Sequence, residues 1–89
     1  MLKPKHSKRF RKDIKEFEHQ KTVMLALKDI IERLLRQIPL DERNCDHPLS
    51  GNWIGHRECH VKPDILLVYK TDDESLFLER LGSRSERFK

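Results

Sequence analysis

The sequence predicts one α+β domain in which an N-terminal helical hairpin covers one face of a small, mainly antiparallel sheet. Apolar residues repeat with a helical period in the first 38 positions, and three short strand-like runs follow position 55. A chain of 89 residues has room for one hydrophobic core, so residues 1–89 form a single domain. The expected order is β-α-α-β-β-β, and the sheet face away from the helices is left open.

An edge strand and the first helix come first. Residues 2–6 predict a strand at a sheet edge, because Pro4 has no amide proton to donate to a neighbouring strand. Ser7 is a suitable N-cap for a helix from about residue 8 to about residue 18. The apolar stripe of this helix is Phe10, Ile14 and Phe17.

The second helix follows after a connection of about three residues, so the two helices should form an antiparallel hairpin. Thr22 is its expected cap. It should end near Gln37, because Pro39 disfavours helical geometry at the residue before it. Its apolar positions follow a 3.6-residue period and are Val23, Leu27, Ile30, Ile31, Leu34, Leu35 and Ile38.

Three strands complete the sheet as a meander. The expected strands are residues 56–61, 65–70 and 76–81, and residues 62–64 form a tight turn between the first two. The middle strand, Ile65-Leu66-Leu67-Val68-Tyr69, is apolar on both faces, which predicts a central position.

Titratable and anion-binding side chains are concentrated in the stretch 46–64. Because successive side chains of a strand point to opposite faces, Glu58 and His60 should share one face, and Cys59 and Val61 the other. The apolar pair should face the helices, so His60 should point into the open face.

His47 and Asp64 lie in the loops on either side of this strand and can converge with His60. Two imidazoles and a carboxylate on a basic surface suit general acid–base chemistry, for example deprotonation of a ribose 2′-OH. Arg57 or Arg80 could neutralise a phosphate. The residue pattern leaves open the alternative that these are surface histidines without a role.

The two cysteines do not predict a zinc site or a disulfide. Cys59 and His60 are neighbours on a strand, so they point to opposite faces, and the C-x₂-C spacing of zinc sites is absent. Two thiols are too few for a disulfide framework, which favours a reducing compartment, the cytoplasm. The sequence shows no signal peptide and no apolar run long enough to span a membrane.

The net charge of +4 favours a polyanionic partner, which could be RNA, DNA or an acidic protein. A basic surface that is only solvated remains the alternative. Trp53, the only tryptophan, is either a lid over the edge of the core or a platform on which a base stacks.

A long ordered motif resembles one known family. The run D-H-P-L-S-G-N-W-x-G-x-R-E-C-H-V-K-P-D-x-L-L-V-Y-K begins at Asp46, and L-x-R-L-G-S covers Leu78 to Ser83. The opening K-H-S-K-R-F-R-K-D, from Lys5 to Asp13, fits the same pattern. Together these segments closely resemble the YafQ-like branch of the RelE/ParE toxin superfamily.

The resemblance implies a RelE-like fold and a bacterial type II toxin that cleaves mRNA in the A site of the 70S ribosome without a metal or other cofactor. It implies a cognate antitoxin that wraps the toxin, and contact with operator DNA only through that antitoxin. His47, His60 and Asp64 match the family's catalytic residues, and Phe88 matches an aromatic residue that contacts the substrate base. No membrane contact is implied.

Arg84 departs from the family pattern. The family's C-terminal motif has a catalytic histidine where this chain has Arg84. An arginine stays protonated near pH 7, so it can bind phosphate and stabilise developing charge but cannot exchange a proton. The expected result is an endoribonuclease with reduced activity in which Arg80 and Arg84 contact phosphate.

Two alternatives to this enzyme stay open. The first is a catalytically weak module that binds the antitoxin and co-represses its own operon. The second is a ParE-like protein that acts on DNA gyrase, although such a protein has no use for a set of acid–base groups.

Overall fold

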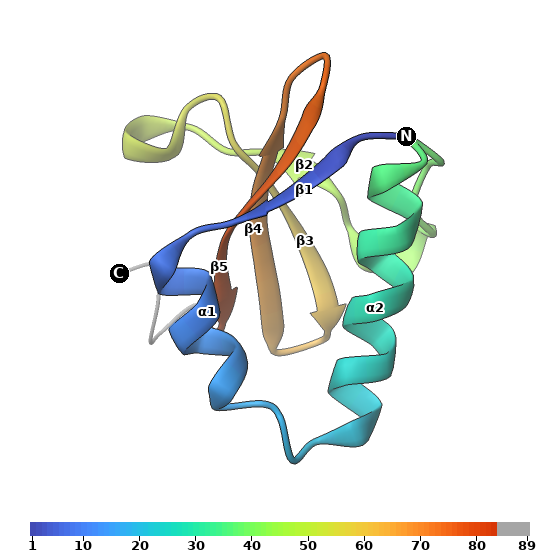
Figure 1. Cartoon of the computed structure of the whole chain (residues 1–89), viewed down its shortest axis with the longest axis vertical. Coiled ribbons are helices and arrows are strands. Elements are labelled where there is room, and N and C mark those ends of the chain that lie inside the picture. The colour runs from blue at the N-terminus through green and yellow to red at the C-terminus, as the bar shows by residue number, and fades with distance from the viewer. Residues whose placement is uncertain (84–89) are drawn as a thin grey trace.

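Two helices lie on one face of a five-stranded sheet in the computed structural model of the chain, which describes residues 1–83 (Figure 1). The helices are α1 (Lys8–Lys15) and α2 (Lys21–Leu35). The strands are β1 (Lys3–His6), β2 (His47–Pro48), β3 (Arg57–Lys62), β4 (Ile65–Thr71) and β5 (Ser75–Gly82). Two short 3₁₀ helices, η1 (Glu42–Asn44) and η2 (Gly51–Trp53), precede and follow β2. The predicted fold class is confirmed.

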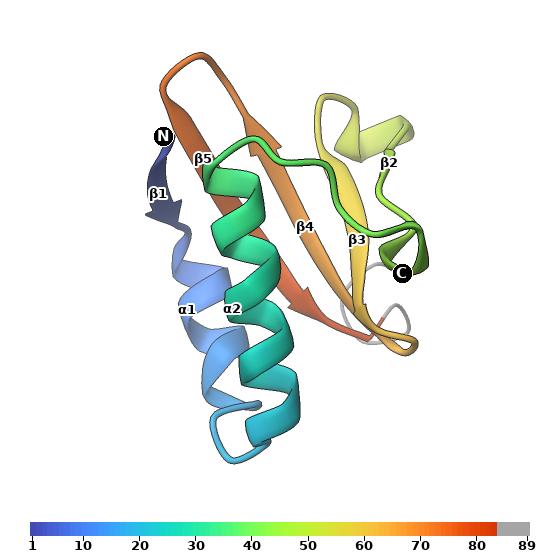
Figure 2. The same cartoon turned by 90° about the vertical axis from the view of Figure 1, so that its right-hand side faces the viewer.

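The strand order is β1-β5-β4-β3-β2, with β1 parallel to β5 and every other pair antiparallel. β4 is central, as its two apolar faces predicted. The register aligns His47 with Glu58, Glu58 with Val68, and Val68 with Arg80. Laterally paired residues of a sheet share a face. These four residues therefore form a row across the sheet face that the helices leave open (Figure 2).

The core lies between the helices and the sheet. Cys59 and Val61 of β3 are buried there, so the predicted facing of this strand is confirmed. Phe10 of α1 is fully buried in the same cluster. Ser7 is the predicted N-cap: its Oγ accepts a hydrogen bond from the Phe10 amide at 2.9 Å and donates one to the Glu79 carbonyl at 2.8 Å. This side chain therefore fixes the start of α1 to β5.

The predicted helix boundaries differ from the structure in two places. α1 ends at Lys15, before residue 18, because the Phe17 amide donates to the Ile14 carbonyl in a tighter turn. Thr22 is not the cap of α2, since the helix begins one residue earlier and Gln20 holds the cap position without a side-chain bond. The end of α2 agrees with the prediction, and Gln37 leaves the helix with φ 59°.

Strand β2 is not predicted from the sequence, because two residues are too few to show alternation. None of the helices among residues 1–83 is both long enough and apolar enough to cross a membrane.

Candidate functional site

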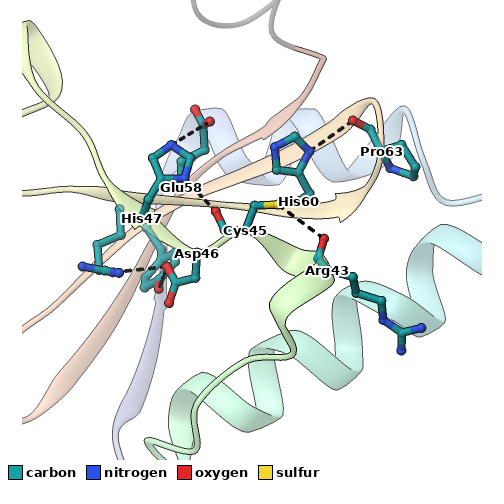
Figure 3. Close-up of polar contacts among 9 residues, drawn as sticks. Arg43, Cys45, Asp46, His47, Glu58, His60 and Pro63 are labelled. Carbon is teal, nitrogen blue, oxygen red and sulfur yellow. Dashed lines mark hydrogen bonds and ion pairs between the residues drawn. The ribbon is translucent and has the colours of Figure 1, made fainter.

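A histidine–carboxylate pair lies on the open face of β3 (Figure 3). Nε2 of His47, on β2, is 3.4 Å from Oε1 of Glu58, on β3. The side chain of Glu58 is 1% exposed, whereas that of His47 is 46% exposed. The carboxylate is therefore buried, and the imidazole beside it is the group that a ligand can reach.

The second nitrogen of His47 also faces an acceptor. Nδ1 lies 2.6 Å from the carbonyl oxygen of Cys45, which has a left-handed backbone with φ 48°. A carbonyl oxygen can only accept, so Nδ1 carries a proton. With the carboxylate of Glu58 beside Nε2, an imidazole protonated at both nitrogens has an acceptor for each N–H. This geometry suits a proton donor.

His60 lies two residues after Glu58 on the same face, a distance of about 7 Å along the strand. Its Nδ1 is 3.1 Å from the Pro63 carbonyl oxygen, so Nδ1 again carries the proton. The neutral ring then has its lone pair on Nε2, which suits a proton acceptor. Asn44 fixes the backbone here, since its Nδ2 donates to the His60 carbonyl at 2.8 Å. Figure 3 shows both imidazoles on one side of β3 and Asp46 on the other.

Asp64 is exposed in the turn between β3 and β4, directly after Pro63. It is the third predicted catalytic residue. The structure brings His47 and His60 onto one face and places Asp64 at the end of the same hairpin.

Arg57 is not brought to this face. It shares the helix-facing side of β3 with Cys59, as the alternation of the strand requires. Its Nε lies 3.2 Å from Oδ1 of Asp46, and the Tyr69 hydroxyl donates to the same oxygen at 2.6 Å. Burial acts to lower the pKa of Arg57, but Tyr69 and Asp46 outweigh burial and raise it. The placement gives Arg57 an anchoring role and does not favour phosphate binding beside His60.

Arg80 is also paired with a carboxylate outside this site. Its Nε and Nη2 lie 3.0 and 3.4 Å from the carboxylate oxygens of Asp13 on α1, and its side chain is 16% exposed. The same carboxylate accepts a hydrogen bond from the Leu81 amide at 2.9 Å. Arg80 therefore ties β5 to α1, which does not favour the predicted phosphate contact. Arg84 and Phe88 lie outside the described residues.

A second histidine–carboxylate pair was not predicted. His56 Nε2 lies 3.5 Å from Glu79 Oε2, and the His56 ring packs edge-on against Trp53 with centroids 5.3 Å apart. The alternation of side chains along a strand could have placed His56 on the same face as Glu58 and His60, because each of these residues lies two positions from the next. Nothing in the sequence indicated that Glu58 is buried.

Both cysteines are free thiols: Cys45 is exposed and Cys59 is buried. Burial raises the pKa of Cys59 to about 12. Among residues 1–83, no three His, Cys, Asp or Glu side chains are grouped so that they could hold a metal ion.

Comparison with known proteins matches residues 2–89 to the model of one family, the YafQ bacterial toxin of type II toxin–antitoxin systems. The mRNA interferase toxin YafQ of Escherichia coli K12 is 37% identical over 84 residues, which cover 93% of this chain and 91% of the relative. YafQ in the E. coli DinJ–YafQ complex is 34% identical, with a TM-score of 0.88 and full coverage of both chains. A metal-bound toxin from Helicobacter pylori is 42% identical, with a TM-score of 0.90 over 99% of this chain and 100% of that one.

Proposed function

The chain belongs to the YafQ family of bacterial toxins of type II toxin–antitoxin systems, and we propose that it is an endoribonuclease that cuts mRNA in the A site of the 70S ribosome. The observation that carries the proposal is the pair of imidazoles on the open face of the sheet. His47 and His60 each have Nδ1 fixed by a carbonyl oxygen, and among residues 1–83 only His47 of the two has a carboxylate at Nε2. A relative named an mRNA interferase supports the same chemistry.

In the proposed reaction His60 Nε2 accepts the proton of a ribose 2′-OH, and the 2′-oxygen attacks the adjacent phosphorus. The bond from phosphorus to the 5′-oxygen breaks, and His47 donates a proton to that oxygen. The products are a 2′,3′-cyclic phosphate, which water can open to a 3′-phosphate, and a 5′-hydroxyl. Asp64, at the end of the same hairpin, shares in the proton transfer. DNA has no 2′-hydroxyl, so it is not a substrate.

The residues beyond position 83 complete this proposal. Arg84 binds the phosphate and Phe88 stacks on a base. Because an arginine cannot exchange a proton near pH 7, we propose that Arg84 lowers the rate relative to a histidine at this position. General acid–base catalysis contributes about 10²–10⁴-fold, so Arg84→His should raise the cleavage rate by up to that range.

The reaction is proposed to need no metal ion. Because a similar toxin from H. pylori is metal-bound, the assay should compare the protein as purified with the protein treated with EDTA and with the protein given an added divalent metal ion. EDTA should leave the cleavage rate unchanged.

The test is to add the protein, with Arg84→His beside it, to translating ribosomes and to map the mRNA ends. Cuts at A-site codons that leave a 2′,3′-cyclic phosphate or a 3′-phosphate are expected, and no cuts are expected when ribosomes are omitted. If neither protein cuts ribosome-bound mRNA, the proposed activity is wrong.

A cognate antitoxin is the proposed protein partner, by analogy with DinJ in the E. coli complex, and operator DNA is contacted only through it. The substitution at Arg84 favours a second candidate, a catalytically weak module that binds this antitoxin and co-represses the operon. Expression without antitoxin separates the two: growth arrest supports the enzyme, and normal growth supports the module.

A further inference from the structure

A cleft of about 590 Å³ lies beside His60, between α2, η1 and the end of β3. Ala26 of α2, which is half-buried, and Pro63, which is exposed, supply apolar surface, and His60 lies at its border. In Figure 3 the imidazole of His60 lies above β3, and Arg43 lies below the strand beside a helix. The volume is within the range of about 300–1,000 Å³ that is typical of pockets for small ligands.

The polar groups of this cleft favour an anionic, hydrogen-bonding ligand. Three cations, Arg33, Arg43 and Lys62, line it together with two carboxylates. Arg33 is paired on its own helix, with Nε 3.3 Å from Asp29 Oδ2. Arg43 is the accessible cation, since its side chain is 84% exposed and its Nε is 3.9 Å from Asp41 Oδ1, too far for a hydrogen bond.

Asn44 gives the cleft a group that can contact a base edge. Its Nδ2 donates to the His60 carbonyl, so Oδ1 remains an acceptor at the side of the cleft. This bond also couples the cleft to the backbone of His60. A strand whose phosphate lies at His60 therefore has an adjacent space with apolar surface, an amide oxygen and a guanidinium.

We propose that this cleft binds the nucleotide next to the scissile phosphate of the RNA, with its base against Ala26 and Pro63 and its phosphate on Arg43. The proposal rests on the proposed function, because it assigns a neighbouring nucleotide of the same substrate. It does not involve the residues beyond position 83.

Cys45 provides a direct reporter, because it lines the cleft and is the exposed one of the two thiols. Cys59 is buried, so iodoacetamide should label Cys45 in the folded protein. The probe is a tetranucleotide of 2′-O-methyl RNA, which cannot be cut because its 2′-oxygens are methylated. At ten times its Kd, a ligand that fully covers the thiol slows alkylation about elevenfold.

Arg43→Glu and Arg9→Glu form a matched pair for this experiment. Both replace an exposed arginine, but Arg9 is on α1, away from the cleft. Arg43→Glu should raise the Kd of the tetranucleotide about tenfold, as expected for a lost hydrogen bond to a charged group. Arg9→Glu should change it less than about twofold at physiological salt, because distant surface charges are screened.

The proposal is overturned if the tetranucleotide binds while Cys45 reacts at its unprotected rate, if both variants weaken binding equally, or if no binding is measured. Protection by an oligoglutamate peptide but not by RNA would assign the cleft to an acidic protein and would also overturn it. Cleavage on ribosomes is measured separately, so protection without cleavage contradicts the proposed function alone, and cleavage without protection contradicts the cleft alone.

Discussion

Two buried carboxylates, Asp13 and Glu58, lie in different parts of the fold and have different partners. Asp13, which is 4% exposed, is on α1, where it accepts hydrogen bonds from Arg80 and from the Leu81 amide of β5. Glu58, which is 1% exposed, is on the open side and lies beside His47. An arginine keeps its charge at any ordinary pH, whereas a histidine exchanges protons near neutral pH.

The difference separates a structural ion pair from the proposed site of proton transfer. The Asp13–Arg80 pair joins α1 to β5 with a fixed charge and two hydrogen bonds from the guanidinium. The Glu58–His47 pair places a buried carboxyl group beside an imidazole that solvent can reach. Burial of a carboxylate alone therefore does not mark the site; the identity and the exposure of its partner do.

The largest effect on stability is expected for Asp13→Ala. This change leaves Arg80 buried without its partner, which costs about 3–5 kcal/mol of the free energy of unfolding. Urea denaturation measures it, with Asp29→Ala as control, since Asp29 forms an exposed pair with Arg33 on α2 and should cost about 0.5 kcal/mol or less. Equal losses in the two variants would contradict a structural role for Asp13.

A smaller effect, on activity, is expected for Glu58→Gln. The amide keeps the size of the side chain but removes the charge beside His47, and a hydrogen bond to a charged group is worth about 1.5–3 kcal/mol. The cleavage rate should fall about 10- to 100-fold, with a smaller loss of stability than for Asp13→Ala. If Glu58→Gln cuts mRNA at the parent rate, Glu58 is a second structural carboxylate and the comparison fails.

Cys59, the neighbour of Glu58 on β3, faces the helices and should make the free energy of unfolding depend on pH. Burial raises its pKa from 9.0 to about 12, so the folded state favours the neutral thiol. The stabilisation is complete below pH 9 and is lost as the pH rises from 9 towards 12, because the unfolded chain ionises first. Between pH 8 and 10.5 the parent protein should lose about 2 kcal/mol more stability than Cys59→Ala. If the stabilities of the parent protein and of Cys59→Ala fell in parallel over this pH range, the burial of the Cys59 thiol would not be the cause.

The fold was predictable because its signals are local. The apolar repeats gave both helices, and the alternation of β3 correctly placed His60 opposite Cys59. The same alternation, applied to Arg57 and His56, would have placed those residues correctly too.

Other features depend on contacts between distant parts of the chain. Arg80 meets a carboxylate 67 positions away, so its role could not be read from the motif around it. Glu58 lies opposite His47 because the two-residue strand β2 pairs with β3, and so short a strand has no pattern of its own. The cleft beside His60 likewise needs α2 and η1 to come together.

The central claim is that His47 and His60 on the open face transfer protons during RNA cleavage. The most direct measurement is the single-turnover cleavage rate of ribosome-bound mRNA for His47→Gln and His60→Gln, with circular dichroism to establish that both variants fold. Because each imidazole is proposed to transfer a proton, the rate should fall about 10²–10⁴-fold for each variant relative to the parent protein. Folded variants that both cut within about threefold of the parent rate would contradict it.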